Sequence, residues 1–277
     1  SFNGISYGAL LFLLASGLTL IFGVMRIVNL SHGAYFLLGG YIALSVIWAT
    51  GSWVLAVPVA ALAVAVVGLV MERVFLRPLG FDPLRQVLLT VGFAFLFQQA
   101  ALDIWGGNNL DITPPELLRG STVVGELHLP IYRIFMIGMA VVLGAILWLV
   151  MEKTRAGAMI RAAVDDSQMA RGVGIDTSRV SMFIFALGAF LAALAGVIGG
   201  GFLGIYPGLD FEILPIAFAV VIIGGMGSLT GAAVGSLIVG LADNFGKALF
   251  PEVSYFTLYA PMVLILALKP TGLFGRE

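Results

Sequence analysis

Two short segments carry part of the spacing of a catalytic or nucleotide-binding motif. Residues 4–8 read G-x-S-x-G, but the nucleophile elbow with this pattern needs a strand before the serine and a helix after it, whereas this pentapeptide opens an apolar segment. Gly246 and Lys247 resemble a phosphate-binding loop, yet Gly240 is one residue too far upstream and Ala248 replaces the required Ser or Thr. We therefore expect neither a catalytic serine nor ATP bound by this chain.

Metal ligands are equally scarce. The 277 residues include no Cys, which removes disulfides, thiolate metal sites and cysteine nucleophiles together. His32 and His128 are far apart, and neither is paired with a Glu or a second His at metal-ligand spacing. We expect this chain to bind no metal and no cofactor of its own.

The densest polar group in the first hundred residues is the segment RIVNLSHG, which begins at Arg26. Polar and ionisable side chains inside a membrane usually face the bundle interior or a water-filled cavity. The candidates for a solute path in this segment are Asn29, Ser31, His32 and Gly33. The alternative, which the N-cap preference favours, is an interfacial connection in which Arg26 reaches the membrane surface and Asn29 or Ser31 caps the next helix.

A glycine cluster supplies the other candidates for a solute path. Gly224, Gly225 and Gly227 end the apolar segment 213–226, which is short for a full crossing. Irregular backbone at membrane depth is tolerated where it lines a cavity or is buried in protein. We therefore expect a broken or re-entrant helix at this point.

Charged residues near the segment ends have simpler explanations. Asp243 could bind a cation or a solute amine, but Lys247 follows four residues later, and an i, i+4 ion pair accounts for both. Glu72 next to Arg73 is typical of interfacial charge at a helix end.

The elements that must position these residues are membrane helices. The chain is 60% hydrophobic and 10% charged, with a mean hydropathy of +1.09, and soluble domains carry about 25% charged residues. Charge-poor apolar segments fall at 4–24, 32–48, 54–72, 86–102, 131–151, 180–203, 213–226, 229–246 and 255–269. We predict an all-α polytopic transmembrane bundle with eight or nine membrane segments. The first segment lacks a basic leader and is long enough to span, so we expect a true helix there.

Organisation and charge indicate one membrane domain. The two long connections, 103–130 and 152–179, are each too short to bury an independent core, so residues 1–277 form one domain. The stretch 73–85 holds three Arg and 152–179 holds five Lys or Arg, whereas 103–130 holds one Arg. By the excess of basic residues in cytoplasmic loops, 103–130 is external, 73–85 and 152–179 are cytoplasmic, the N-terminus lies outside and the C-terminus inside. The net charge of -1 gives no basic patch for a nucleic acid.

Small residues recur at helical spacing in the later segments. Gly227, Gly231 and Gly235 are spaced every four residues, and so are Ala192, Gly196 and Gly200. Helices in lipid associate closely through small residues. We expect helix packing at Gly196, Gly200, Gly231 and Gly235, with a solute path lined by some of these glycines as the alternative.

The cytoplasmic stretch 154–179 has the composition of a docking element. Residues 162–171 are good helix formers, and Gly172 and Gly174 supply stop signals after them. This predicts a short amphipathic helix between two spans. Because a solvated loop seldom presents so many apolar side chains together, we expect an interface with a soluble partner.

At this loop the chain resembles the branched-chain amino acid permease family of ABC importers. The blocks that carry the resemblance are NLSHGAYFLLGGYIA at 29–43, RAAVDDSQMARGVGID at 161–176 with its preceding TRAG, IIGGMGSLTGAAVGSLIVGLA at 222–242 and KPTGLFGR at 269–276. The resemblance implies that the loop is the coupling helix that docks on an ATPase subunit. The residues it assigns to coupling are Arg161, Ala162, Ala163, Asp165, Asp166, Met169, Ala170, Arg171, Gly172 and Gly174.

The same resemblance implies the other subunits of an importer complex. It adds a second homologous permease, two cytoplasmic ATPase subunits that carry ATP and Mg, an external or periplasmic solute-binding protein, and a bacterial inner membrane. Related permeases carry aliphatic amino acids, urea, amides or aromatic acids. We expect a non-enzymatic transport subunit that imports branched-chain or other amino acids or related small polar solutes. The alternatives are a self-sufficient secondary transporter or channel, which would need more intramembrane charge, and an intramembrane hydrolase, for which no nucleophile and base pair is present.

Overall fold

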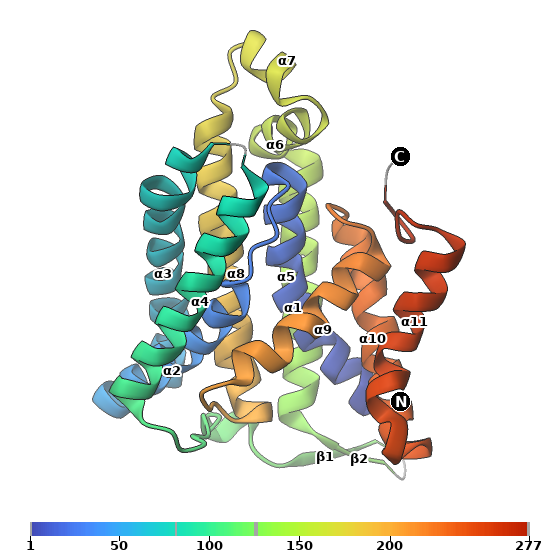
Figure 1. Cartoon of the computed structure of the whole chain (residues 1–277). Coiled ribbons are helices and arrows are strands. Elements are labelled where there is room, and N and C mark those ends of the chain that lie inside the picture. Colours follow the sequence, from blue (N-terminus) through green and yellow to red (C-terminus); the bar gives the residue numbers. More distant parts are fainter. Residues whose placement is uncertain (1, 81, 125–126, 276–277) are drawn as a thin grey trace.

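A computed structural model describes residues 2–80, 82–124 and 127–275 and shows a helical bundle with one short hairpin (Figure 1). The helices of the bundle are α1 (Phe2–Met25), α2 (His32–Thr50), α3 (Trp53–Val70), α4 (Pro83–Trp105), α5 (Ile131–Lys153), α8 (Thr177–Leu203), α9 (Leu209–Gly224), α10 (Leu229–Leu249) and α11 (Ser254–Leu268). The connections contain η1 (Met71–Leu76), η2 (Arg77–Leu79), η3 (Glu116–Leu118), β1 (Ser121–Val124), β2 (Leu127–Pro130), α6 (Arg155–Asp165), α7 (Ser167–Gly172) and η4 (Pro251–Val253). This is the all-α membrane bundle that the sequence predicts.

Each of the nine predicted apolar segments forms a helix. In the described part of the chain, seven helices are long and apolar enough to cross a membrane, one of them continuing from α3 through η2. The two that fall short in length are α9, with 16 residues, and α11, with 15. The predicted number of eight or nine crossings is therefore approximate. The difference from seven comes from the two short helices, α9 and α11.

Residue types that commonly cap helices stand at the ends of α2, α3 and α4. Ser52 accepts a hydrogen bond from the N–H of Leu55 and begins α3, and Asp82 accepts one from the N–H of Arg85 and begins α4. Helix α2 ends at Gly51, whose φ of +69° is the left-handed conformation in which glycine avoids a steric penalty. These caps fix where α3 and α4 begin, and so fix the connections on both sides of them.

Helices α1, α2 and α8 form the centre of the bundle, and the others surround them. Most of α1 and α8 is buried inside the chain, whereas only 17% of the most apolar window of α4 or of α5 is buried. Close approach between α2 and α8 depends on small residues, because a Cβ on Gly196 would collide with the carbonyl oxygen of Phe36. The exposed apolar faces of α4 and α5 therefore need lipid or another protein as a neighbour.

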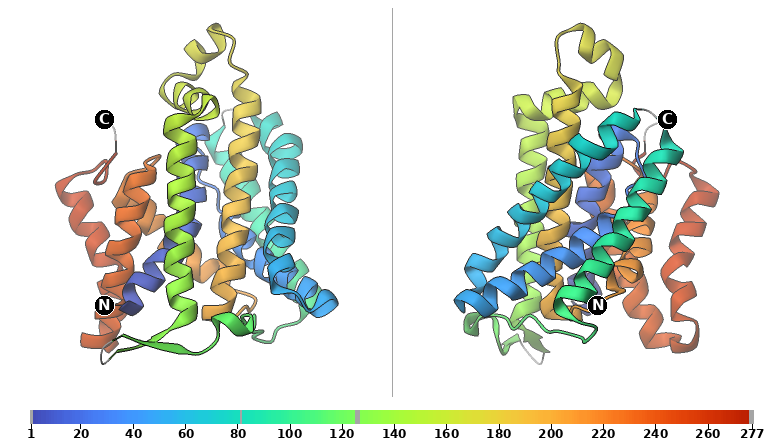
Figure 2. Two further views of the ribbon diagram at one scale, coloured as in Figure 1. Left: turned by 180° about the vertical axis from the view of Figure 1, so that it is seen from behind. Right: turned by 60° about the vertical axis from the view of Figure 1, so that its left-hand side comes forward.

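The two ends of the bundle differ in what they carry. Helices α6 and α7 project beyond the bundle at one end, where the connection between α3 and α4 and the tail 269–275 also lie (Figures 1 and 2). The β1–β2 hairpin and the start of α1 lie at the opposite end. This arrangement places 73–85 and 152–179 on one side and 103–130 on the other. Which side is cytoplasmic stays a prediction.

The projecting loop differs from the single helix predicted for residues 162–171. It forms two helices, because Asp166 leaves the helical conformation at the end of α6 and accepts hydrogen bonds from the N–H groups of Gln168 and Met169 at the start of α7. The first helix also begins earlier, where Thr154 caps the N–H of Gly157. Gly174, with a φ of +89°, follows α7 as the stop signal requires.

Candidate solute path and coupling loop

The polar segment that begins at Arg26 is unwound and runs back into the bundle. Helix α1 ends at Met25, and Arg26 adopts a left-handed φ of +54°, which is unusual for a residue with a side chain. Helix α2 begins only at His32, whose Nε2 lies 3.0 Å from the carbonyl oxygen of Leu14, near the middle of α1. The extended stretch between the two helices therefore passes from one end of the bundle toward its middle (Figure 1).

This geometry differs from the capped interfacial connection that the N-cap preference favours. Ser31 stands at the N-cap of α2, but its hydroxyl makes no capping bond and donates instead to Oδ1 of Asn29 at 2.7 Å. Asn29 accepts a second bond from the N–H of Ser31, so its side chain stabilises the turn before α2 and does not cap the helix.

The four predicted path residues of this segment are buried. Asn29, Ser31 and His32 are fully buried, and Gly33 packs so closely on the start of α9 that a Cβ there would collide with the carbonyl oxygen of Asp210. Their role in solute transport stays a prediction. The structure brings them together at the junction of α1, α2, α8 and α9.

The second break lies between α9 and α10. Gly225 and Gly227 have φ values of +99° and +85°, which glycine adopts without a steric penalty. The C-terminal tail covers this break, because the N–H groups of Leu273 and Phe274 donate to the carbonyl oxygens of Ile223 and Gly224, each at 2.9 Å. The tail thus provides hydrogen-bond donors for the carbonyl oxygens at the end of α9. The sequence did not indicate this contact.

Of the predicted packing glycines, Gly196, Gly231 and Gly235 lie at contacts between helices, whereas Gly200 meets residues of two connections. Gly231 on α10 meets the carbonyl oxygen of Gly224 on α9, and Gly235 meets that of Val220. Gly200 on α8 has no room for a Cβ beside Ile112 and Ile205. The Asp243 and Lys247 pair predicted from its spacing is confirmed, with Nζ 2.9 Å from Oδ2.

An apolar groove of about 480 Å³ opens beside the unwound segment. Its wall comes from four separate parts of the chain: the unwound segment, α4, α9 and α11. The lining residues include Leu30, Val91, Leu214, Phe218, Ile222 and Met262. The sequence analysis did not identify this groove, because its residues are ordinary apolar positions of helices that meet only in the folded chain.

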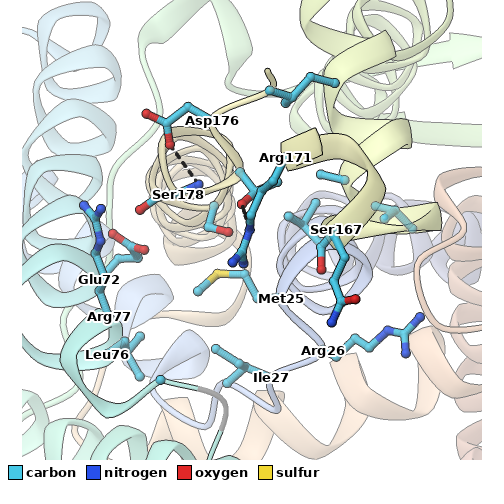
Figure 3. Close-up of a pocket in the computed structure, with 18 of the residues that line it drawn as sticks. Met25, Arg26, Ile27, Glu72, Leu76, Arg77, Ser167, Arg171, Asp176 and Ser178 are labelled. Carbon is cyan, nitrogen blue, oxygen red and sulfur yellow. Dashed lines mark hydrogen bonds between the residues drawn. The ribbon is translucent and has the colours of Figure 1, made fainter. Parts of the chain in front are cut away.

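A charged pocket of about 820 Å³ lies at the end of the bundle beneath α6 and α7 (Figure 3). The ends of α1, η1, α7 and α8 surround it. Its charged lining residues include Arg26, Glu72, Arg77, Asp166, Arg171 and Asp176. Both acidic and basic groups line this pocket, so it suits a solute that carries both charges.

Glu72 stands at a helix end, as the sequence predicts, but it is not exposed there. It lies in η1, a single π-helical turn, and its side chain is buried, with the residue 2% exposed. Among the described residues its Oε2 has no hydrogen-bond partner. Such π-turns are frequent at functional sites, and this one places the carboxyl group on the wall of the charged pocket (Figure 3).

The predicted coupling residues divide between a buried and an exposed face. Ala163 and Ala170 are buried, whereas Met169 is 65% exposed. Val173, an apolar residue of the same loop outside the predicted set, is 70% exposed. Nη1 of Arg161 lies 3.8 Å from Oε2 of Glu152 at the end of α5. Nε of Arg171 donates a hydrogen bond of 2.8 Å to the hydroxyl of Thr177 at the start of α8. The loop is therefore tied to the two helices that enter it, while apolar side chains stay on its outer surface.

Comparisons with known proteins agree on one family. Residues 1–266 match the family model described as the permease component of the branched-chain amino acid transport system. The high-affinity branched-chain amino acid transport system permease protein LivH of Escherichia coli K12 is 32% identical over 294 residues, which covers 99% of this chain and 94% of that protein. The corresponding BraD of Pseudomonas aeruginosa is 31% identical over 293 residues, with the same coverage.

The fold also matches a solved structure. PsaBC from Streptococcus pneumoniae in complex with Fab has a chain that superposes with a TM-score of 0.51, covering 96% of this chain and 89% of that one at 11% identity. At this identity the likeness concerns the fold alone.

Proposed function

The chain belongs to the family of branched-chain amino acid transport system permease components, and on this premise we propose that it is the membrane subunit of an ATP-driven amino acid importer. The observation that carries the proposal is the match over residues 1–266, which includes the bundle, both breaks and the projecting loop. In this proposal, residues 1–277 form one membrane domain that supplies the solute path. ATP and Mg bind to a separate subunit, and this chain catalyses no reaction itself.

The projecting loop is the proposed contact with one of the two cytoplasmic ATPase subunits. Met169 and Val173 form an exposed apolar surface at the outermost part of the molecule, and exposed apolar patches mark interaction sites. Since α6 continues from α5 and α7 leads into α8, movement of the loop is passed to two helices of the bundle. This supports the coupling role of residues 152–179.

The remaining partners follow from the same proposal. The end with α6, α7 and most of the basic connections is cytoplasmic, so the hairpin end faces outward and receives solute from an external solute-binding protein. We place the protein in the bacterial inner membrane, with the start of α1 outside and the tail 269–275 inside. A second homologous permease beside this chain completes the path across the membrane.

The proposed solutes are branched-chain and other aliphatic amino acids. The names of the relatives support this class, and the apolar groove next to a charged pocket offers the two environments that such a molecule needs. Urea, amides and aromatic acids remain the competing solutes to test.

Purification from native membranes tests the proposal. A tagged chain should bring down an ATPase and a second permease, and the complex in liposomes should accumulate radiolabelled leucine only when ATP and the solute-binding protein are supplied. Leucine uptake driven by an ion gradient without any ATPase would instead support a self-sufficient secondary transporter.

A further inference from the structure

The unwound segment connects the two hollows of the molecule. Arg26 and Ile27 line the charged pocket, and Leu30 lines the apolar groove. Helix α4 makes the same connection, because Gln86 lines the pocket and Val91, little more than one turn later, lines the groove. The N–H of Leu30 donates to the hydroxyl of Thr90 at 3.2 Å and holds the segment against α4. The two hollows are therefore neighbours along one wall.

The segment between the two hollows carries hydrogen-bond donors that have no acceptor in the described part of the chain. Among the described residues, the backbone N–H groups of Ile27, Val28 and Asn29 donate to no acceptor. The Nδ2 of Asn29, a fully buried residue, also has no partner in that part of the chain. An unpaired buried backbone donor costs free energy comparable to a lost hydrogen bond. Ile27 and Asn29 are buried and Val28 between them is exposed, so an acceptor from outside this chain, a water or a solute, pairs with these donors.

Lipid cannot be that acceptor. Hydrocarbon offers no hydrogen bonds, and non-helical backbone at membrane depth is tolerated only inside protein or beside a water-filled cavity. Val28, between the free donors, is 37% exposed and so is not covered by this chain. Discontinuous membrane helices bind anionic groups of their substrates at such breaks, where helix N-termini point at the ligand. Helix α2 begins directly after this segment.

The groove beside these donors fits the other part of an aliphatic amino acid. The side chains of Leu30, Leu214 and Ile222 present an apolar surface to it, and a branched aliphatic side chain is stabilised when it leaves water for such a surface. At the other end of the segment, Glu72 lines the charged pocket, and its Oε2, which has no partner among the described residues, is available for a solute ammonium group.

We propose that the unwound segment 26–30 is the inner part of the solute path, where the free N–H groups of Ile27, Val28 and Asn29 donate hydrogen bonds to the carboxylate of an aliphatic amino acid whose side chain lies in the apolar groove. The proposal rests on the proposed function and adds a site and a recognition chemistry to it. The solute then leaves through the charged pocket beneath α6 and α7.

Cysteine labelling tests whether the segment meets water and solute. Because the chain has no Cys, Val28→Cys and Leu30→Cys introduce single thiols, which are probed with a water-soluble thiosulfonate reagent in the reconstituted complex. Both should be modified, and leucine supplied during ATP hydrolysis should abolish most of the labelling. Isoamylamine, which keeps the aliphatic chain and the ammonium group but lacks the carboxylate, should not protect. Leu62→Cys on α3, a position 59% exposed, is the control for a surface that faces lipid.

A pair of variants that differ only in charge tests the carboxylate contact. Val28→Glu places an anion beside the free donors, whereas Val28→Gln has the same size without the charge. Like charges brought together cost several kcal/mol, so leucine uptake should fall by about tenfold or more in the Glu variant relative to the Gln variant. The amount of complex in the membrane and the bound ATPase should be equal in both.

The outcomes separate this inference from the proposed function. Absence of thiol modification at both positions, or protection by isoamylamine equal to that by leucine, would overturn the site while wild-type leucine uptake remains. Equal uptake by the two Val28 variants would overturn the carboxylate contact. If the wild-type complex imports no amino acid with ATP, the proposed function itself fails.

Discussion

The Nε2 of His32 lies 3.0 Å from the carbonyl oxygen of Leu14, which places the first residue of α2 beside the middle of α1. This contact sets the depth at which the unwound segment ends and α2 begins. Because His32 is fully buried, its ring also fills space between α1 and α8, where Gly17 approaches it closely. The start of α2 is thus positioned by one polar contact and by close packing.

Substitution of His32 should destabilise this junction. His32→Phe keeps an aromatic ring but removes the donor to Leu14, and a lost buried hydrogen bond costs about 1 kcal/mol. We expect a lower midpoint of thermal unfolding for the purified complex. His128→Phe on the exposed hairpin strand β2 is the control, and an equal midpoint for both variants would show that the contact does not stabilise the fold.

The sequence predicts the elements well because each membrane helix must be apolar over its whole length. It predicts a polar break between the segments 4–24 and 32–48, but not that the break is unwound and runs back into the bundle, since no glycine or proline occurs between Arg26 and His32 to mark such a path. The division of the loop at Asp166 had a signal, because Asp before Ser167 is a common start of a helix. The sequence contains no signal for the apolar groove, since Leu30, Val91 and Met262 meet only through tertiary contacts.

The contact between α9 and α10 should tolerate no side chain at its centre. A Cβ on Gly231 would collide with the carbonyl oxygen of Gly224, so Gly231→Leu should strongly lower the amount of folded protein, by the 1–3 kcal/mol or more that overpacking costs. Val234, three residues later, is 37% exposed, and Val234→Leu should be mild. Membrane yield and thermal stability of the two variants measure the difference. Equal yields would show that the glycine face is not a tight interface.

Two introduced thiols can determine how the chain is oriented across the membrane. Thr113→Cys lies in the connection between α4 and α5, and Ser167→Cys lies at the start of α7. A membrane-impermeant thiol reagent applied to intact cells should label the first and leave the second unlabelled until the cells are opened. Labelling of Ser167→Cys alone from outside would reverse the assignment of both ends and contradict the proposed coupling loop.

The last prediction concerns the apolar surface of the loop. Met169 is exposed in the isolated chain, and in the proposed complex it packs against an ATPase subunit. Met169→Asp would bury an unpaired charge in that contact, at a cost of about 3–5 kcal/mol, so ATPase association should weaken by a factor of 100 or more, about 1.4 kcal/mol per tenfold change.

The bundle should be unaffected by this change, because the side chain lies outside its core. Met169→Leu keeps the apolar contact and serves as the matched control, with near-normal association and uptake. We would measure three quantities for each variant: the amount of inserted chain, the ATPase that co-purifies with it, and ATP-dependent leucine uptake in liposomes. Normal insertion with loss of the other two is the expected result for Met169→Asp, and unchanged uptake with the ATPase still bound would remove this residue from the coupling mechanism.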